Sequence, residues 1–172
     1  AERNANAGMV VGVEPPDYPR DPAAFEAMLG ATHGVESLPQ DHTHPLAGIV
    51  LQRQLESRAF ALGGGDYNAP AQRVGDFLAR RASTALGDVQ PSYQPGVTLA
   101  NMDDALPAYA TTAMREALPA FARKIRGYDM ADAVLTGVET RTSAPLRMDR
   151  GEDFQSLNTR GLYPAGEGAG YA

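Results

Sequence analysis

The sequence of 172 residues contains no cysteine and no tryptophan. The absence of cysteine excludes disulfides, thiolate nucleophiles and sulfur-ligated metals together. A Gly-x-Ser-x-Gly motif is also absent, so no nucleophilic serine chemistry is indicated. No apolar run approaches the roughly 20 residues of a membrane helix, and no basic stretch followed by an apolar core opens the chain. We therefore expect a soluble, cytoplasmic protein that does not associate with membranes.

Positive charge is scarce as well. The 15 basic residues are outnumbered by 21 acidic ones, which gives a formal net charge of -6. This balance does not create the attractive field that nucleic-acid binding requires. Lys124 is the only lysine, and the remaining basic residues are arginines. Together with the many alanines, this indicates genomic composition rather than a set of anion sites, and we expect no nucleic-acid partner.

The length and the two ends of the chain suggest a piece of a longer protein. With 43% hydrophobic residues, the chain suits one compact domain or one domain with an extension. It does not begin with Met, and it ends in the glycine-rich run 168–172, which neither caps a helix nor finishes a strand. We therefore expect that both ends are cut.

Three segments have the apolar spacing of amphipathic helices. In 46–62, apolar residues recur at intervals of three and four, and the glycines at 63–65 then end the helix. A second helix is predicted over 70–81, since proline suits the first helical turn. A third is predicted over 105–121, where Pro119 should kink or end it. The residues that form the first apolar face are Ala47, Val50, Leu51, Leu55, Ala59 and Leu62.

A shorter helix is predicted near the N-terminus, in a region rich in turn formers. Asp21 can accept a hydrogen bond as the cap, and Pro22 fits the first helical position of a segment that extends to residue 29. We expect most of the remainder of 17–45 to form exposed loops.

Strands are expected at both ends of the chain. The β-branched run 9–13 predicts one strand, and 133–140, 145–148 and 161–165 predict three more after the helical region. The order of strand, helices and strands predicts an α+β fold, with helical segments and a small, mostly antiparallel sheet. We expect the change from helical to extended pattern to divide the chain into 1–130 and 131–172.

The segment 159–170 is a short apolar stretch that leads into a glycine-rich turn with one acid, Glu167. Glycines allow a ligand to approach the backbone, and amides at the start of a following helix point toward a phosphate or an electron-rich ring edge. The carboxylate can accept hydrogen bonds from sugar or ribityl hydroxyls. From the residues alone, a purely structural turn is the favoured interpretation, because a strand followed by a glycine-rich turn is common.

This turn resembles the second flavin-binding motif of flavoproteins with two dinucleotide-binding domains, in which a Gly-Asp or Gly-Glu pair meets the ribityl chain of FAD. Gly166 and Glu167 match that pair. Together with the segments 64–72, 118–121 and 135–147, the chain resembles a bacterial family of uncharacterised FAD-dependent dehydrogenases, known as NAD(P)/FAD-dependent oxidoreductases. The resemblance covers most of residues 1–172.

The resemblance implies a cofactor site and a place in a larger enzyme. Residues 1–130 would be the inserted, substrate-side domain, and 131–172 would be strands that return to the flavin-binding domain. A full-length member would carry a Gly-x-Gly-x-x-Gly fingerprint, which is absent from this sequence. We therefore expect the chain by itself to be inactive and to hold FAD weakly. The implied FAD contacts are Gly166, Glu167, Gly168, Ala169, Gly170 and Thr142.

The resemblance also implies a reaction. NAD(P)H or another donor would reduce FAD, and the flavin would pass a hydride to a small organic acceptor, for which activated carbon–carbon double bonds are candidates. Arg141 and Ser143 would reach the flavin ring or an anionic substrate, although a solvated turn is the alternative. Tyr67 would face substrate, unless the glycine loop before it only connects two helices. No residue is predicted as catalytic.

Two other possibilities were considered. His33, Asp41, His42 and His44 include a His-x-His ligand spacing, but the sequence has no further histidine or carboxylate cluster to complete a shell, so we predict no metal. As an alternative to an enzyme, the chain would be a non-catalytic interaction domain with the three predicted helices, 46–62, 70–81 and 105–121, as its docking surface.

Overall fold

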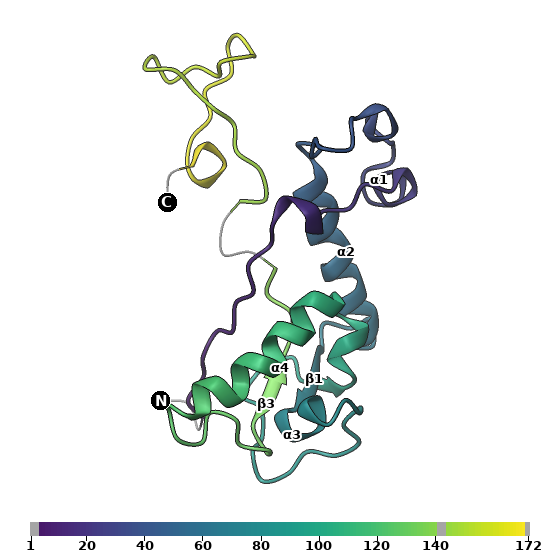
Figure 1. Ribbon diagram of the computed structural model, residues 1–172, viewed down its shortest axis with the longest axis vertical. Helices are drawn as coiled ribbons and strands as arrows, with labels where there is room; N and C mark the ends of the chain where they lie inside the picture. The colour runs from purple at the N-terminus through teal and green to yellow at the C-terminus, as the bar shows by residue number, and fades with distance from the viewer. Residues whose placement is uncertain (1–3, 141–143, 171–172) are drawn as a thin grey trace. The chain divides into compact units, whose positions relative to one another are not determined.

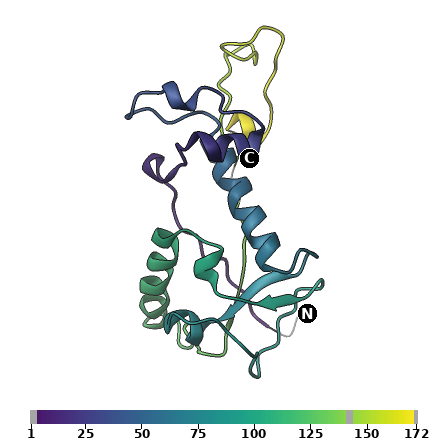
Figure 2. The same ribbon diagram turned by 90° about the vertical axis from the view of Figure 1, so that its right-hand side faces the viewer.

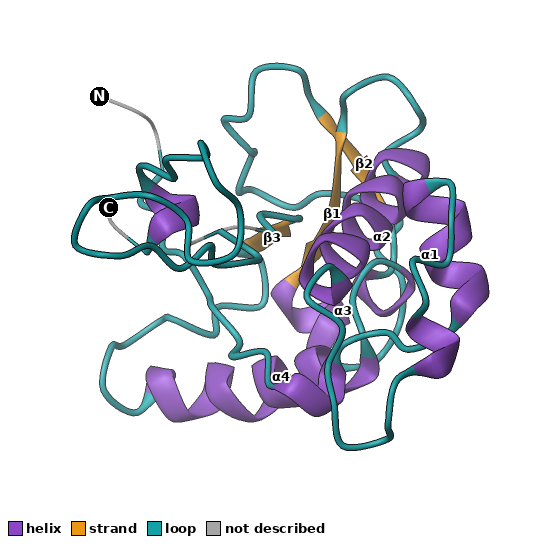
Figure 3. Cartoon of the chain, turned by 90° about the horizontal axis from the view of Figure 1, so that it is seen from above, coloured by secondary structure: helices purple, strands orange, loops and turns teal. Residues whose placement is uncertain are grey.

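The computed structural model describes residues 4–140 and 144–170 of the chain. Helices and a small sheet alternate within these residues, so the predicted α+β class is confirmed (Figure 3). No helix in the described ranges is both long and apolar enough to cross a membrane. In chain order, the elements are α1 (Pro22–Leu29), α2 (Ala47–Leu62), β1 (Ala69–Arg73), α3 (Val74–Leu78), β2 (Val97–Leu99), α4 (Ala108–Ala122) and β3 (Val134–Thr136), and the 3-10 turns are η1 (Pro15–Asp17), η2 (Val35–Ser37), η3 (Met102–Asp104) and η4 (Glu167–Ala169).

The chain forms two compact units. Unit 1 comprises the residues up to Gly12 together with Leu55–Val138, and unit 2 comprises Val13–Gln54 together with the residues from Glu139 onward. The division falls within α2, so this helix contributes residues to both. The expected division into 1–130 and 131–172 concerns the origin of the segments in a parent protein and stays a prediction.

The sheet of unit 1 has three strands with β1 in the centre (Figure 2). Its two neighbours differ in direction: β2 is parallel, with Ala69 beside Val97, and β3 is antiparallel, with Ala71 beside Thr136. The sheet is therefore mixed, whereas the sequence predicted mostly antiparallel pairing. The parallel pair follows from the long connection between β1 and β2, because parallel neighbours require a crossover rather than a tight turn.

The predicted helix 70–81 is wrong over its first part, because residues 69–73 form β1 and only α3 is helical. The helix was predicted because a proline near the start of an apolar segment is typical of the first turn of a helix. In the sheet, Pro70 lacks an N–H but uses its carbonyl, which accepts a hydrogen bond from the Gly137 amide at 3.0 Å. Pairing with distant segments therefore outweighs the local preference.

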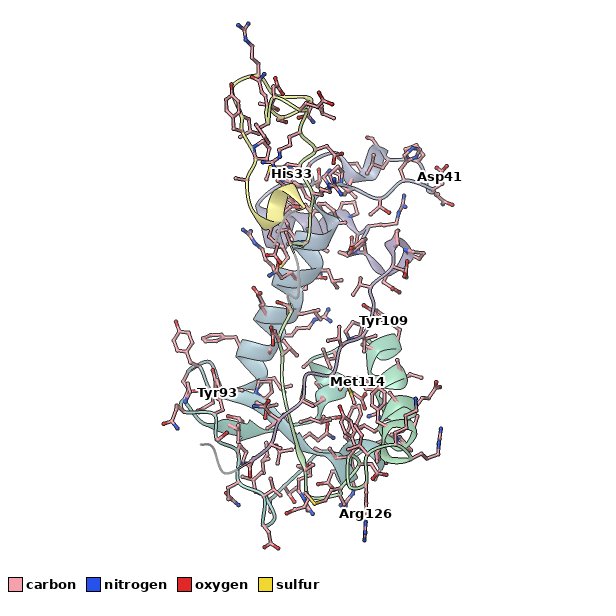
Figure 4. All side chains as sticks on the ribbon, turned by 90° about the vertical axis from the view of Figure 1, so that its left-hand side faces the viewer. His33, Asp41, Tyr93, Tyr109, Met114 and Arg126 are labelled. Atoms are coloured by element: carbon pink, nitrogen blue, oxygen red, sulfur yellow. The ribbon has the colours of Figure 1, made fainter. Side chains whose placement is uncertain are left out.

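Helix α4 runs through unit 1 and supplies part of its core (Figure 1). Its Ala110, Met114 and Leu118 are buried, as the apolar spacing predicted. The proline at position 119 lies inside α4, which ends within one turn of it at Ala122. The fully buried cluster that Met114 and Leu118 join, with Met114 labelled in Figure 4, also contains Val74, Phe77, Met102 and Ala105.

Unit 2 has a separate core around α1 and the first part of α2. The predicted cap of α1 is confirmed, because the Asp21 side chain accepts a hydrogen bond from the Ala23 amide at 3.0 Å and Pro22 is the first helical residue. This cap satisfies one of the amides that a helix start leaves without a partner. The buried residues of this core are Phe25, Val35, Ala47 and Val50.

Three of the predicted strands do not form: residues 9–13, 145–148 and 161–165 are irregular, and only 134–136 of the segment 133–140 is a strand. Within residues 9–13, Met9 and Val11 pack on the core of unit 1, whereas Val10 and Val13 are exposed. Alternation alone does not make a strand, because a strand also needs a neighbour with free backbone groups.

Candidate functional site

The predicted flavin-binding turn lies in unit 2, where 167–169 form the 3-10 turn η4. Gly166 precedes it with φ 70° and ψ -151°, a backbone conformation that glycine adopts and other residues avoid. The amides of Ala169 and Gly170 are bonded within the turn, to the carbonyls of Gly166 and Glu167 at 3.0 and 2.8 Å. The Glu167 carboxyl is exposed.

At two positions of this turn, close packing explains why the residue is glycine. A Cβ on Gly168 would lie 3.1 Å from the end of the Met148 side chain, and one on Gly170 would lie 3.2 Å from the guanidinium of Arg147. The Gly168 carbonyl also accepts the Met148 amide at 2.7 Å. These contacts support the structural alternative for the two positions without excluding a ligand contact.

Gly166 and Glu167, the first two residues of the turn, are exposed. Gly166 has no atom within 4 Å of the place where a Cβ would stand, so its backbone is open to close approach. The exposed Glu167 carboxylate is an acceptor for hydroxyl groups. Ala169 is only 2% exposed, and its amide donates to the Gly166 carbonyl.

The other predicted contacts next to the cofactor, Arg141, Thr142 and Ser143, lie outside the described residues. Nearby, Arg147 is exposed and forms an ion pair of 3.0 Å with Asp149. Such a surface pair contributes little to stability, which leaves this arginine available for other contacts.

Tyr67 lines a cavity of about 260 Å³ whose walls all belong to unit 1. We call this cavity the aromatic pocket, because the rings of Phe60, Tyr67 and Tyr93 form part of its wall. The first two rings meet edge to face, with centroids 5.7 Å apart and planes at 70°. The Tyr93 hydroxyl donates a hydrogen bond to the Tyr67 carbonyl at 3.4 Å. The other lining residues are Glu56, Ala59, Asn68, Ala69, Pro70, Gly137 and Val138.

The glycines at 63–65 position this pocket by ending α2 directly before it. The Gly65 amide donates to the Phe60 carbonyl at 2.9 Å and the Gly64 amide to the Ala61 carbonyl at 3.1 Å. This pair of bonds is a Schellman motif, and Gly64 adopts the positive φ of 108° that it needs. The predicted end of the helix is therefore confirmed, and the chain turns back so that Tyr67 faces Phe60.

Of these three rings, the sequence predicted only Tyr67 as a site residue, and Phe60 and Tyr93 were not predicted. Phe60 lies off the apolar face of α2 and is 47% exposed, which is unusual for a large aromatic side chain. An aromatic residue outside the apolar face of the helix was the feature of the sequence that could have identified Phe60. Tyr93 precedes β2 in an irregular segment and is labelled in Figure 4; its position depends on the sheet pairing that the local sequence did not reveal.

One strongly bonded charge pair of unit 1 includes no residue of the aromatic pocket. Arg115 is buried and donates to both carboxylate oxygens of Asp103, at 2.8 and 2.7 Å, and to the Phe77 carbonyl at 2.8 Å. Its guanidinium also covers the Phe77 ring, 4.2 Å from the centroid. Hydrogen bonding to Arg115 lowers the pKa of Asp103 below its ordinary value of 3.8. This arrangement joins α4 to η3 and α3, and its role is structural.

The histidines of unit 2 also have structural partners. His44 packs edge to face on Phe25 with centroids 4.9 Å apart, accepts the Leu46 amide at 3.0 Å, and has its other ring nitrogen 3.1 Å from the His33 carbonyl. His42 pairs with Asp41 at 3.1 Å on the surface. In the part of the chain that the structure describes, no three histidine or acidic side chains are grouped as a metal site would require.

Comparison with known proteins confirms the resemblance found in the sequence. The family described as FAD-dependent protein, C-terminal domain-like, matches residues 1–142, which end before the glycine-rich turn. A Clostridium beijerinckii protein, described only as an uncharacterized protein, is 44% identical over 169 residues. The alignment covers 98% of this chain but 28% of that relative, so the chain spans little more than a quarter of its length. The chain belongs to the family of FAD-dependent proteins, C-terminal domain-like.

Proposed function

We propose that this chain is part of an FAD-dependent oxidoreductase in which NAD(P)H or another donor supplies electrons and a small organic molecule accepts a hydride. The observation that carries the proposal is the family match over residues 1–142. The much greater length of the relative leaves room for the dinucleotide-binding fingerprint that this sequence lacks. The reaction, the donor and the acceptor are all part of the proposal.

The turn at 166–170 is the part of this chain that we assign to the cofactor. FAD, when bound, supplies the hydride-transfer chemistry, and the protein supplies orientation and electrostatics. Glu167 would accept hydrogen bonds from ribityl hydroxyls, and the open backbone at Gly166 would let the ligand approach. Thr142 would add a hydroxyl contact, and Arg141 and Ser143 would face the ring or the substrate.

Purified full-length parent protein tests the class of function. We expect a yellow protein whose visible absorption is bleached by a chemical reductant and restored by air. A colourless protein that takes up no flavin on incubation with excess FAD would instead favour the alternative, a non-catalytic interaction domain. NAD(P)H added without air would then identify the donor, since bleaching by the nicotinamide is expected only if it reduces the flavin.

The 172-residue chain tests the division of the cofactor site. Because the fingerprint for the ADP half of FAD is absent from this sequence, we expect isothermal titration of the chain with FAD to give weak or undetectable binding. Micromolar or tighter binding would contradict the view that most of the site lies elsewhere in the parent.

The segment 141–143 has its own test in the parent enzyme. An Arg141→Ala change should shift the flavin potential or lower turnover, because the cation would no longer stabilise negative charge near the ring. Unchanged potential and turnover would remove this residue from the proposal.

A further inference from the structure

We propose that the aromatic pocket of unit 1 binds a small planar, conjugated organic molecule against the rings of Phe60, Tyr67 and Tyr93. The identification of that molecule as the hydride acceptor rests on the proposed function. The binding itself rests only on the geometry of the pocket.

The first argument is the exposure of three rings around one cavity. Phe60 and Tyr93 are each 47% exposed and Tyr67 is 78% exposed, although all three line the same space. Aromatic side chains bury large areas when they can, and an exposed cluster of them marks a surface where something binds. The three rings come from α2, from the loop after it and from the segment before β2, so their meeting is a product of the tertiary fold.

The second argument is that Tyr67 is held in place before any ligand arrives. Its φ of 70° is left-handed, a conformation that is unfavourable for a residue other than glycine. The bond from the Tyr93 hydroxyl and the edge-to-face contact with Phe60 maintain it. The contact with Phe60 restricts the Tyr67 ring before binding, which favours affinity for a rigid, flat partner.

The third argument is the size and lining of the pocket. Pockets for drug-sized ligands begin at about 300 Å³, so this open surface hollow of about 260 Å³ suits a single ring that lies against its wall. Pro70 and Val138 extend the apolar wall, while Glu56 and Asn68 provide polar groups at its edge. Mostly apolar walls with a few polar groups are typical of small-molecule sites, and stacked or edge-on rings select planar π systems.

Nuclear magnetic resonance on the 172-residue chain tests the proposal directly. The chain has seven tyrosines, five phenylalanines and no tryptophan, so its aromatic spectrum is simple enough to assign. The probe is trans-cinnamamide, which is planar, uncharged and conjugated, and the matched control is the saturated 3-cyclohexylpropanamide. We expect saturable shifts at Phe60, Tyr67 and Tyr93 with cinnamamide, and binding at least about threefold weaker for the saturated amide.

Three variants separate ring contact from other effects. Tyr67→Ala should weaken cinnamamide binding by about three- to tenfold, whereas Tyr67→Phe, which keeps the ring, should bind as the unmodified chain does. Tyr163→Ala, at an exposed tyrosine of unit 2, should have no effect. Circular dichroism verifies that each variant is folded.

The proposal is overturned if cinnamamide causes no saturable shift at the three rings, if the saturated amide binds equally well, or if folded Tyr67→Ala binds normally. A colourless parent protein would contradict the proposed function and would leave this binding result unchanged, so the two failures are distinguishable.

Discussion

Among single residues, Arg115 joins several parts of unit 1. Its side chain is 7% exposed and bonds the Asp103 carboxylate and the Phe77 carbonyl, while the Asp103 side chain is 31% exposed. A buried charge that loses its partner is no longer compensated for its lost hydration. Removal of one member of such a pair therefore lowers stability more than replacement of both members.

Replacement of Arg115 by Met should therefore destabilise the chain. We expect a loss of about 3 kcal/mol, at the lower end for a broken buried pair because Asp103 keeps some contact with water. Urea unfolding followed by circular dichroism measures it. Arg58→Met, at an exposed arginine of α2, is the control and should change stability by less than about 0.5 kcal/mol. Equal losses for the two variants would show that the pair does not contribute.

Asp103 should also make the unfolding free energy of the chain depend on pH. Because Arg115 lowers its pKa in the folded state, the carboxylate contributes stability at every pH above its unfolded value of 3.8. That contribution is lost as the pH falls below 3.8 through the lowered pKa of the folded protein. Between neutral pH and about pH 3, Asp103→Asn should lose less stability than the unmodified chain. Parallel curves of unfolding free energy against pH would contradict this origin.

At the scale of elements, the loop between α2 and β1 shows how a turn positions a side chain. A Cβ on Gly63 would lie far inside contact distance of the Asn68 carbonyl oxygen, and the Gly63 carbonyl accepts a hydrogen bond from the Thr98 hydroxyl. The start of the loop is therefore in contact with the end of the loop, at Asn68, and with β2, at Thr98.

Gly63→Ala should move this loop and, with it, the Tyr67 ring. We expect a loss of about 1–3 kcal/mol in unfolding free energy, because the obstacle is backbone rather than a flexible side chain. Chemical shifts of Phe60 and Tyr67 should change in the same variant. Gly12→Ala is the matched control, since a Cβ there meets no atom within 4 Å. Unchanged shifts in a fully stable Gly63→Ala protein would disprove the close approach.

Elements also differ in how well their local sequence predicts them. The apolar spacing of α2 and α4 and the cap of α1 are visible in adjacent residues, and all three helices form within a turn or so of their predicted bounds. Strand β1 was not predicted, because the strands that pair with it are distant in the sequence. Gln72, fully buried in β1, donates to the Arg81 carbonyl and accepts the Met102 amide, both at 2.8 Å. No local pattern indicates such bonds.

For the whole molecule, the central question is how the turn at 166–170 serves a parent flavoprotein. The family match ends at residue 142, so the assignment of this turn to FAD rests on its motif rather than on that match. Its exposed carboxylate and the open backbone at Gly166 are the features to test in the complete protein.

In the full-length parent, Glu167→Ala should weaken FAD binding by about tenfold, as expected for the loss of hydrogen bonds to a charged acceptor. Fluorescence titration of apoprotein with FAD measures this change. Glu152→Ala, at another exposed acid of unit 2, is the control and should bind FAD normally. If both variants retain full affinity, the turn has only the structural role that its packing on Met148 suggests.

The sequence by itself determined the α+β class, the three longer helices, the glycine end of α2 and the family, because each depends on residues close together in the chain or on their order. Only the tertiary structure decided the mixed sheet and the aromatic pocket. β1 pairs with segments about 30 and 60 residues away, and the pocket needs Phe60, Tyr67 and Tyr93 to meet through that pairing. Contacts between distant segments form only when the whole unit folds, so local patterns do not encode them.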